Sequence, residues 1–124
     1  MLHYRQMDDL VRMLREKLPN VPMLMTTPPG SYESFRQRRR RRTYKINPRT
    51  AVAVQTIRCY ADENGLAVWD MYEILGGTHR ACLNWQEAGL MGPDHVHYLP
   101  DGYRLQGELF CQALLKAYND YVEY

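Results

Sequence analysis

A carboxylate and an imidazole lie three residues apart in the last third of the sequence. They are Asp94 and His97, in a loop just before a strongly patterned helix. A carboxylate that is hydrogen-bonded to one ring nitrogen fixes the imidazole in a single tautomer, so the other nitrogen can accept a proton from a hydroxyl. The pair therefore has the spacing expected of the acid and base of a hydrolase triad. His95 lies between them, and we expect it to face away and assign it no chemistry.

The sequence offers no good nucleophile for this pair. Its only serines, Ser31 and Ser34, lie in a segment rich in Pro, Gly and Arg. Neither follows the strand-to-helix pattern that exposes a nucleophilic hydroxyl at a sharp turn. The chemistry of a triad is thus half present.

A compact basic run marks the middle of the chain. The net charge is only +2, but residues 34–61 hold nine Arg or Lys and no acid, whereas residues 62–124 hold three basic residues and ten acidic ones. Five basic residues are adjacent, namely Arg38, Arg39, Arg40, Arg41 and Arg42. Adjacent like charges repel, which favours a solvated, mobile loop unless an anion orders it. A solvated loop and a site for an anionic polymer both remain open.

Composition limits the class of protein. With 124 residues, 45% of them apolar, the chain fits one domain spanning 1–124. No apolar run is long enough for a membrane span, and the N-terminal residues show no signal-peptide core, so no compartment is assigned. We expect Cys59, Cys82 and Cys111 to be small buried apolar residues, and their spacing suggests no disulfide framework, metal or cofactor. A nucleic acid is not expected as a partner, since nucleic-acid binders usually spread basic residues over a face among aromatic ones.

The pattern along the chain predicts alternating helices and strands. An amphipathic helix over 7–18 ends at Pro19-Asn20, and a buried strand over 21–27 follows. A long irregular segment then runs to about Asn47, where Asn47-Pro48 is a typical helix start. The remaining elements are a helix ending at Asn64-Gly65, a second buried strand over 66–70, a helical turn over 71–75 and a last helix from Pro100. The alternation over 50–56 also fits a strand in place of that first helix.

This order of elements favours an α/β fold with parallel strands joined by crossover helices. In such sheets, functional residues gather beyond the carboxyl ends of the strands. Asp70 would lie there, and we expect it to organise its loop. Two strands are too few for a stable parallel sheet. We therefore expect the chain to be the C-terminal portion of a larger domain, or a unit whose open edge a second copy covers.

The stretch from Pro19 onward resembles the C-terminal half of the SGNH hydrolases, also called GDSL-type esterases, and in particular a bacterial branch with peptidoglycan O-acetylesterases. The matching features are Val68-Trp69-Asp70, the pair Gly76-Gly77, Trp85 and Gly89, then Asp94-x-x-His97, and Gly102-Tyr103 in the first turn of the last helix. One departure is Leu99, where the family often has a Ser or Thr able to cap that helix.

The resemblance implies an incomplete flavodoxin-like α/β/α fold and a site for carboxylic-ester hydrolysis. His97 would be the general base and Asp94 its orienting carboxylate. The family's Gly-Asp-Ser nucleophile block and its oxyanion Gly and Asn are not found in this sequence. The resemblance implies a small acyl ester, such as an acetylated carbohydrate, as substrate, and no cofactor. The chain alone is expected to be inactive, and a secreted or periplasmic location stays open.

An alternative of a different class is a non-catalytic module that binds a polyanion through residues 38–42. The two hypotheses differ in what they require. The first needs the Asp94 and His97 side chains in contact beside an opening, and the second needs an accessible basic loop whose affinity for polyanions falls with salt.

Overall fold

The computed structural model describes residues 2–123, without the side chains of Leu2, His79 and Ala81. In chain order the elements are α1 (Leu2–Lys17), β1 (Leu24–Thr26), β2 (Tyr32–Phe35), β3 (Thr43–Ile46), α2 (Pro48–Glu63), β4 (Ala67–Trp69), α3 (Met71–Ile74), α4 (Gly77–Glu87) and α5 (Pro100–Val122). None of the helices in this part of the chain is both long and apolar enough to cross a membrane.

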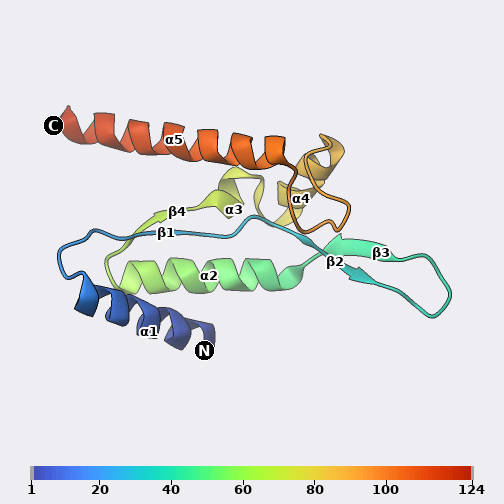
Figure 1. Ribbon diagram of the computed structural model, residues 1–124, viewed down its shortest axis with the longest axis horizontal. Coiled ribbons are helices and arrows are strands. Elements are labelled where there is room, and N and C mark those ends of the chain that lie inside the picture. Colours follow the sequence, from blue (N-terminus) through green and yellow to red (C-terminus); the bar gives the residue numbers. More distant parts are fainter. Residues whose placement is uncertain (1, 124) are drawn as a thin grey trace.

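A pair of parallel strands forms the centre of the fold. β1 pairs with β4, with Leu24 opposite Ala67 and Thr26 opposite Trp69. The first strand is where the sequence predicts it, but its predicted burial is wrong, because Leu24 and Thr26 are exposed. Figure 1 shows α1 and α2 on one side of these strands and α5 on the other. The predicted α/β class with parallel strands is therefore confirmed. Within residues 2–123 neither strand has a further partner, so each keeps one open edge.

Helix α2 begins and ends where the sequence predicts. The side chain of Asn47 accepts a hydrogen bond from the backbone N–H of Arg49, and Pro48 occupies the first turn. At the other end Asn64 is the C-cap, and Gly65 follows with φ of +64°. That left-handed backbone conformation favours glycine, which explains why the helix ends there.

The segment between Gly30 and Asn47 is not irregular, and this prediction is wrong. β2 and β3 pair antiparallel, with Tyr32 opposite Ile46 and Phe35 opposite Thr43. The hairpin extends away from the body of the molecule, with the arginine run at its tip (Figure 1). Its strands are four residues long and largely exposed, so they lack the apolar alternation that marks a half-buried strand.

The core lies beneath the loop that carries Asp94 and His97. Its buried side chains come from α2, α3, α4 and that loop: Val54, Tyr72, Leu75, Cys82, Trp85, Met91 and Tyr98. By contrast, the predicted apolar stripe of α1 buries only Val11, while Leu10, Leu14 and Leu18 are exposed. Leu114, Leu115, Tyr118 and Tyr121 of α5 are exposed as well. Both helices therefore present apolar side chains that nothing in the described chain covers.

The cysteines differ in their surroundings. Cys82 is buried in the core, as predicted. The same prediction is wrong for Cys59 and Cys111, which are exposed on α2 and α5. The Cys59 thiol donates to Glu63 one turn further along its own helix instead of packing inward. Burial of a residue on a helix depends on what covers that face, and the outer faces of these helices are uncovered.

Candidate active site

The loop that carries Asp94 and His97 is closed by backbone hydrogen bonds. Met91 and Tyr98 form an antiparallel bridge at its base, and both side chains are buried in the core. The N–H of Gly92 donates to the carbonyl of His97 at 2.7 Å. The Tyr98 hydroxyl donates to the carbonyl of Gly30 at 2.7 Å, which ties the loop to the segment after β1. The loop is therefore anchored at both ends.

Asp94 accepts hydrogen bonds through both carboxylate oxygens. Its Oδ1 accepts the backbone N–H groups of Val96 and His97, each at 3.0 Å. Its Oδ2 lies 2.6 Å from Nδ1 of the His97 ring. The bond to His97, with help from the two backbone amides, lowers the pKa of Asp94 well below its ordinary value. Asp94 is thus a carboxylate fixed in position and charged at neutral pH.

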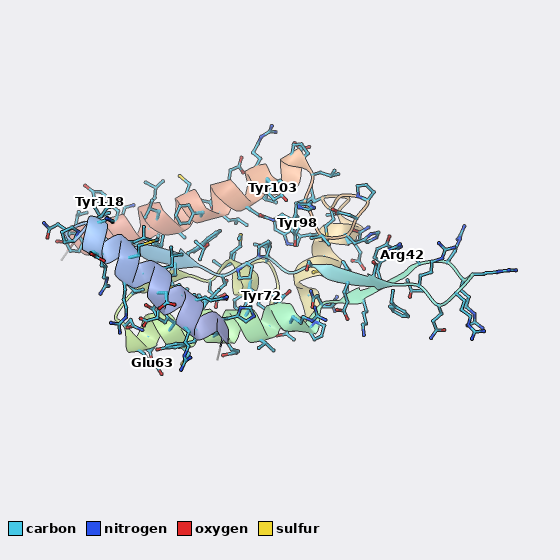
Figure 2. The ribbon with its side chains drawn as sticks, turned by 60° about the horizontal axis from the view of Figure 1, so that its bottom comes forward. Arg42, Glu63, Tyr72, Tyr98, Tyr103 and Tyr118 are labelled. Carbon is cyan, nitrogen blue, oxygen red and sulfur yellow. The ribbon has the colours of Figure 1, made fainter. Side chains whose placement is uncertain are left out.

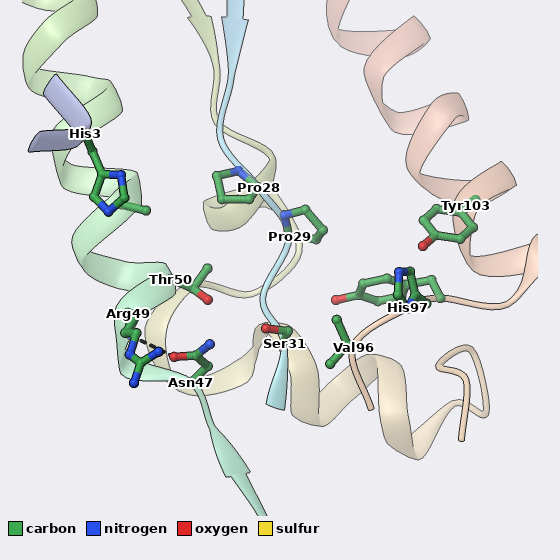
Figure 3. A pocket seen from close by; sticks show the side chains of 12 residues that line it. His3, Pro28, Pro29, Ser31, Asn47, Arg49, Thr50, Val96, His97 and Tyr103 are labelled. Atoms are coloured by element: carbon green, nitrogen blue, oxygen red, sulfur yellow. Dashed lines mark hydrogen bonds between the residues drawn. The ribbon is translucent and has the colours of Figure 1, made fainter. Parts of the chain in front are cut away.

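His97 has one ring nitrogen engaged and one available. With the proton on Nδ1, the ring donates to Asp94, and Nε2 has no hydrogen-bond partner among the described residues. The His97 side chain is 73% exposed, and it lines an open pocket (Figure 3). An exposed imidazole that is held in one tautomer, with Nε2 unprotonated, can accept a proton from a hydroxyl that approaches it.

The pocket brings residues from distant segments together. Ser31 and Arg49 lie across from His97 and Tyr103, with Asn47 beside Arg49 (Figure 3). Ser31 shares the pocket with His97, but no hydrogen bond between their side chains is found in residues 2–123. No Asp or Glu is among the residues that line it. The lining therefore carries the positive charge of Arg49 and no negative charge, which suits a neutral ester or an anionic substrate.

Arg49 is a pocket residue that is not among those predicted from the sequence. Arg49 lies in the first turn of α2, next to the cap residue Asn47. The helix-start signal Asn47-Pro48 could have indicated it, because helix starts and strand ends meet at the functional edge of an α/β sheet. What the sequence does not show is that this turn faces the loop of His97.

His95 is engaged with the hairpin. Its ring stacks on Tyr44 of β3, with centroids 3.6 Å apart, and contacts Tyr32 of β2 edge-on. Its backbone φ of +59° is in the left-handed region, where residues other than glycine are uncommon. The backbone N–H of Tyr32 donates to the carbonyl of His95 at 2.9 Å. His95 therefore joins the loop of the candidate site to the hairpin.

Asp70 organises the end of β4, in line with the expected role. It is the N-cap of α3, and its two oxygens accept from the Thr27 hydroxyl at 2.8 Å and from Nε of Arg58 at 2.6 Å. Burial acts to raise the pKa of Asp70, but these hydrogen bonds outweigh it, and the pKa lies below its ordinary value. Thr27 also accepts the N–H of Tyr72. This network fixes the ends of both parallel strands.

The arginine run lies apart from the pocket. Arg42 is on the hairpin that extends from the body, and Tyr98 and Tyr103 are on the body itself (Figure 2). Gln37, Arg38, Arg39 and Arg40 line a hollow at the hairpin tip. In the part of the chain that is described, no cluster of three or more His, Cys, Asp or Glu residues is arranged to hold a metal ion.

Comparison with known proteins places the fold. No family model matches the chain, and no curated protein matches it significantly. A solved structure of a peptidoglycan O-acetylesterase superposes with a TM-score of 0.79 at 23% identity, over 94% of this chain and 32% of that one. The esterase domain of the ORF1 protein from the zebrafish ZfL2-1 retrotransposon gives 0.61 at 16% identity, over 90% of this chain and 56% of that one.

These likenesses establish the fold. The chain has a partial SGNH hydrolase-like fold of the flavodoxin-like α/β type, as the resemblance predicted. It spans about a third of the length of the first structure and just over half of the second.

Proposed function

We propose that this chain supplies the general base and its orienting carboxylate to a carboxylic-ester hydrolase of the SGNH type. The observation that carries the proposal is the 2.6 Å contact between Asp94 and Nδ1 of His97, whose exposed side chain lines a pocket and whose Nε2 has no partner among residues 2–123. In the complete site a serine attacks the ester carbonyl, and His97 accepts its proton and returns it to the leaving alcohol. Asp94 stabilises the imidazolium that forms between these steps.

The nucleophilic serine and the oxyanion donors are proposed to lie in residues outside this chain. Three features support this. β1 and β4 form a sheet of two strands with open edges. Apolar side chains of α1 and α5 are uncovered. The chain matches only part of each esterase structure. A further segment that adds parallel strands would cover these surfaces and bring a serine to the carboxyl ends of the strands.

The proposed substrate is a small acyl ester, such as an acetyl ester on a carbohydrate. The pocket beside His97 is open, and no carboxylate lines it, so an ester carbonyl can approach without repulsion. The structural likeness to a peptidoglycan O-acetylesterase supports the same class of substrate.

A chemical-rescue experiment tests the role of His97 with the chain as it exists. Hydrolysis of p-nitrophenyl acetate by the chain alone should be weak, because the attacking hydroxyl is missing. Added trifluoroethanol should restore acyl transfer in proportion to its concentration, since His97 can take the proton of an external alcohol. General-base catalysis of this kind contributes about 100- to 10,000-fold, so His97→Ala should remove most of the alcohol-dependent rate. Asp94→Ala should lower it as well.

His3→Ala is the matched control, because His3 is an exposed imidazole that lines the same pocket. It should leave the alcohol-dependent rate unchanged. Equal rates in His97→Ala and the unmodified chain would refute the proposed base. Turnover without alcohol that is lost in Ser31→Ala would instead identify Ser31 as the nucleophile and contradict the assignment of that role to residues outside the chain.

A further inference from the structure

We propose that the β2–β3 hairpin is a binding arm for an acidic polysaccharide, and that it presents an ester on that polymer to the His97 pocket. This inference rests on the proposed function, because it names the class of substrate that the site would take. The proposal also gives residues 38–42 a binding function, which they would not have as a purely solvated loop.

The tip of the arm carries uncompensated positive charge. The side chains of residues 38–41 make no hydrogen bond or ion pair within residues 2–123, and three of these arginines line the hollow at the tip. The flanking arginines secure the loop instead, because Arg36 donates to the carbonyl of Arg40 and Arg42 donates to the Ser34 hydroxyl. Three of the four free arginines, Arg38, Arg39 and Arg40, thus share one concave surface at the tip. Guanidinium groups bind carboxylate groups with paired hydrogen bonds.

The arm leads directly to the candidate active site. β3 ends at Ile46, and the next residues include Asn47 and Arg49, which line the His97 pocket. The N–H of Asn47 donates to the carbonyl of Ser31 at 2.9 Å, which closes the base of the hairpin beside the pocket. Four residues of strand extend about 13 Å and the loop over 36–42 lies beyond them, so a polymer segment that reaches from the tip to the pocket must be longer than about 13 Å. Arg49 provides a positive charge at the pocket end of this path.

Contacts at the base fix the direction of the arm. The ring of Tyr44 stacks on His95, and the N–H of Tyr32 donates to the carbonyl of His95. His95 lies between Asp94 and His97 in the sequence. A polymer bound at the tip is therefore held in a defined position relative to His97 and Asp94, which is the arrangement needed for positioning a substrate.

The side chains of the arm favour a polysaccharide over a nucleic acid. Binding of single-stranded nucleic acid usually requires aromatic rings on which bases can stack. The hollow at the tip is lined by Gln and Arg and contains no aromatic ring. The hairpin strands also carry Phe35 and Tyr44, which are 47% and 37% exposed. The Lys45 ammonium group lies 5.8 Å from the centroid of Phe35, and one face of Tyr44 stacks on His95. At the tip itself, charge recognition is therefore the main source of affinity.

Binding of a fluorescently labelled oligogalacturonate, followed by anisotropy, tests the proposal without any catalytic readout. The unmodified chain should bind it, with an affinity that falls as salt rises. Replacement of residues 38–42 by Gln should weaken binding about tenfold or more. The control removes five exposed arginines elsewhere and so produces the same change in net charge: Arg5, Arg12, Arg15, Arg80 and Arg104, all to Gln. It should weaken binding far less.

Three outcomes would overturn the proposal. The first is equal loss of binding in the two quintuple variants, which would mean that the affinity depends on net charge and not on the position of the arginines. The second is equal binding of labelled neutral dextran, and the third is tighter binding of single-stranded oligo-dT, which would make the arm a nucleic-acid site. His97→Ala should bind oligogalacturonate as the unmodified chain does. Failure of the esterase proposal and failure of the arm proposal are therefore separable.

Discussion

The imidazole of His95 lies against the ring of Tyr44, with centroids 3.6 Å apart and an interplanar angle of 24°. Tyr44 belongs to β3, and His95 to the loop that carries Asp94 and His97. This stack links the hairpin to the candidate site, together with the edge-on contact of Tyr32 with His95 and the backbone hydrogen bonds at the base of the hairpin. Aromatic pairs contribute about 0.5–1.5 kcal/mol beyond the area that they bury, enough to bias the position of a two-stranded hairpin.

Removal of the Tyr44 ring should loosen the base of the hairpin. Tyr44→Ala deletes the stack, whereas Tyr44→Phe keeps the ring. The reporter is the backbone N–H of Tyr32, which donates to the carbonyl of His95. Hydrogen exchange at this amide should be faster in Tyr44→Ala and unchanged in Tyr44→Phe. If both variants exchange at the rate of the unmodified chain, the backbone hydrogen bonds alone position the hairpin.

Gly102 should not tolerate a methyl group, whereas Gly107 on the same helix should. A Cβ at Gly102 would lie 2.7 Å from the carbonyl oxygen of Leu90 and 3.2 Å from Cβ of Tyr98. Relief of such a clash costs about 1–3 kcal/mol, so Gly102→Ala should lower the free energy of unfolding by that amount. At Gly107 no atom lies within 4 Å of the added Cβ, and Gly107→Ala should raise it by about 0.5–1 kcal/mol. Urea denaturation measures both, and equal effects would contradict the close approach of α5 to Leu90.

The hydroxyl of Thr27 should contribute to the free energy of unfolding, because it joins the ends of the two parallel strands. Thr27 is fully buried; its hydroxyl donates to Asp70 at 2.8 Å and accepts the N–H of Tyr72 at 2.9 Å. Thr27→Val retains the shape but leaves that buried amide without its acceptor, which costs about 1–3 kcal/mol. Thr26→Val is the control, because Thr26 is exposed and β-branched as well. The prediction fails if chemical denaturation gives the two variants the same stability.

The buried thiol of Cys82 should make stability depend on alkaline pH. Burial raises the pKa of Cys82 from 9.0 to about 11. The folded chain therefore keeps a proton that the unfolded chain releases, and the stabilisation is complete below pH 9 and is lost as pH rises through about 11. The free energy of unfolding should fall over this range, less steeply in Cys82→Ala. Cys111→Ala, at an exposed position, should keep the full slope, and an unchanged slope in Cys82→Ala would argue against the burial of this thiol.

Local patterns in the sequence determined the limits of α2 and the proximity of Asp94 and His97. Asn47-Pro48 and Asn64-Gly65 set the limits of α2, because caps act through bonds within a few residues. Asp94 and His97 are close enough in sequence for one short loop to bring their side chains together. The parallel pairing followed from the order of elements, and the partial SGNH-like fold from the resemblance. The catalytic roles of Asp94 and His97 and the binding role of residues 38–42 stay predictions.

Only the tertiary structure decided which surfaces meet and which stay open. The hairpin was missed because its pairing depends on cross-strand contacts rather than on an apolar pattern. The contact of His95 with Tyr44, and the presence of Arg49 and Ser31 in the pocket of His97, join segments far apart in the chain. The exposure of Cys59 and Leu14 likewise depends on what packs against their helices. Residue type and spacing encode local hydrogen bonds and helix faces, whereas contacts between distant segments arise from the packing of the whole chain.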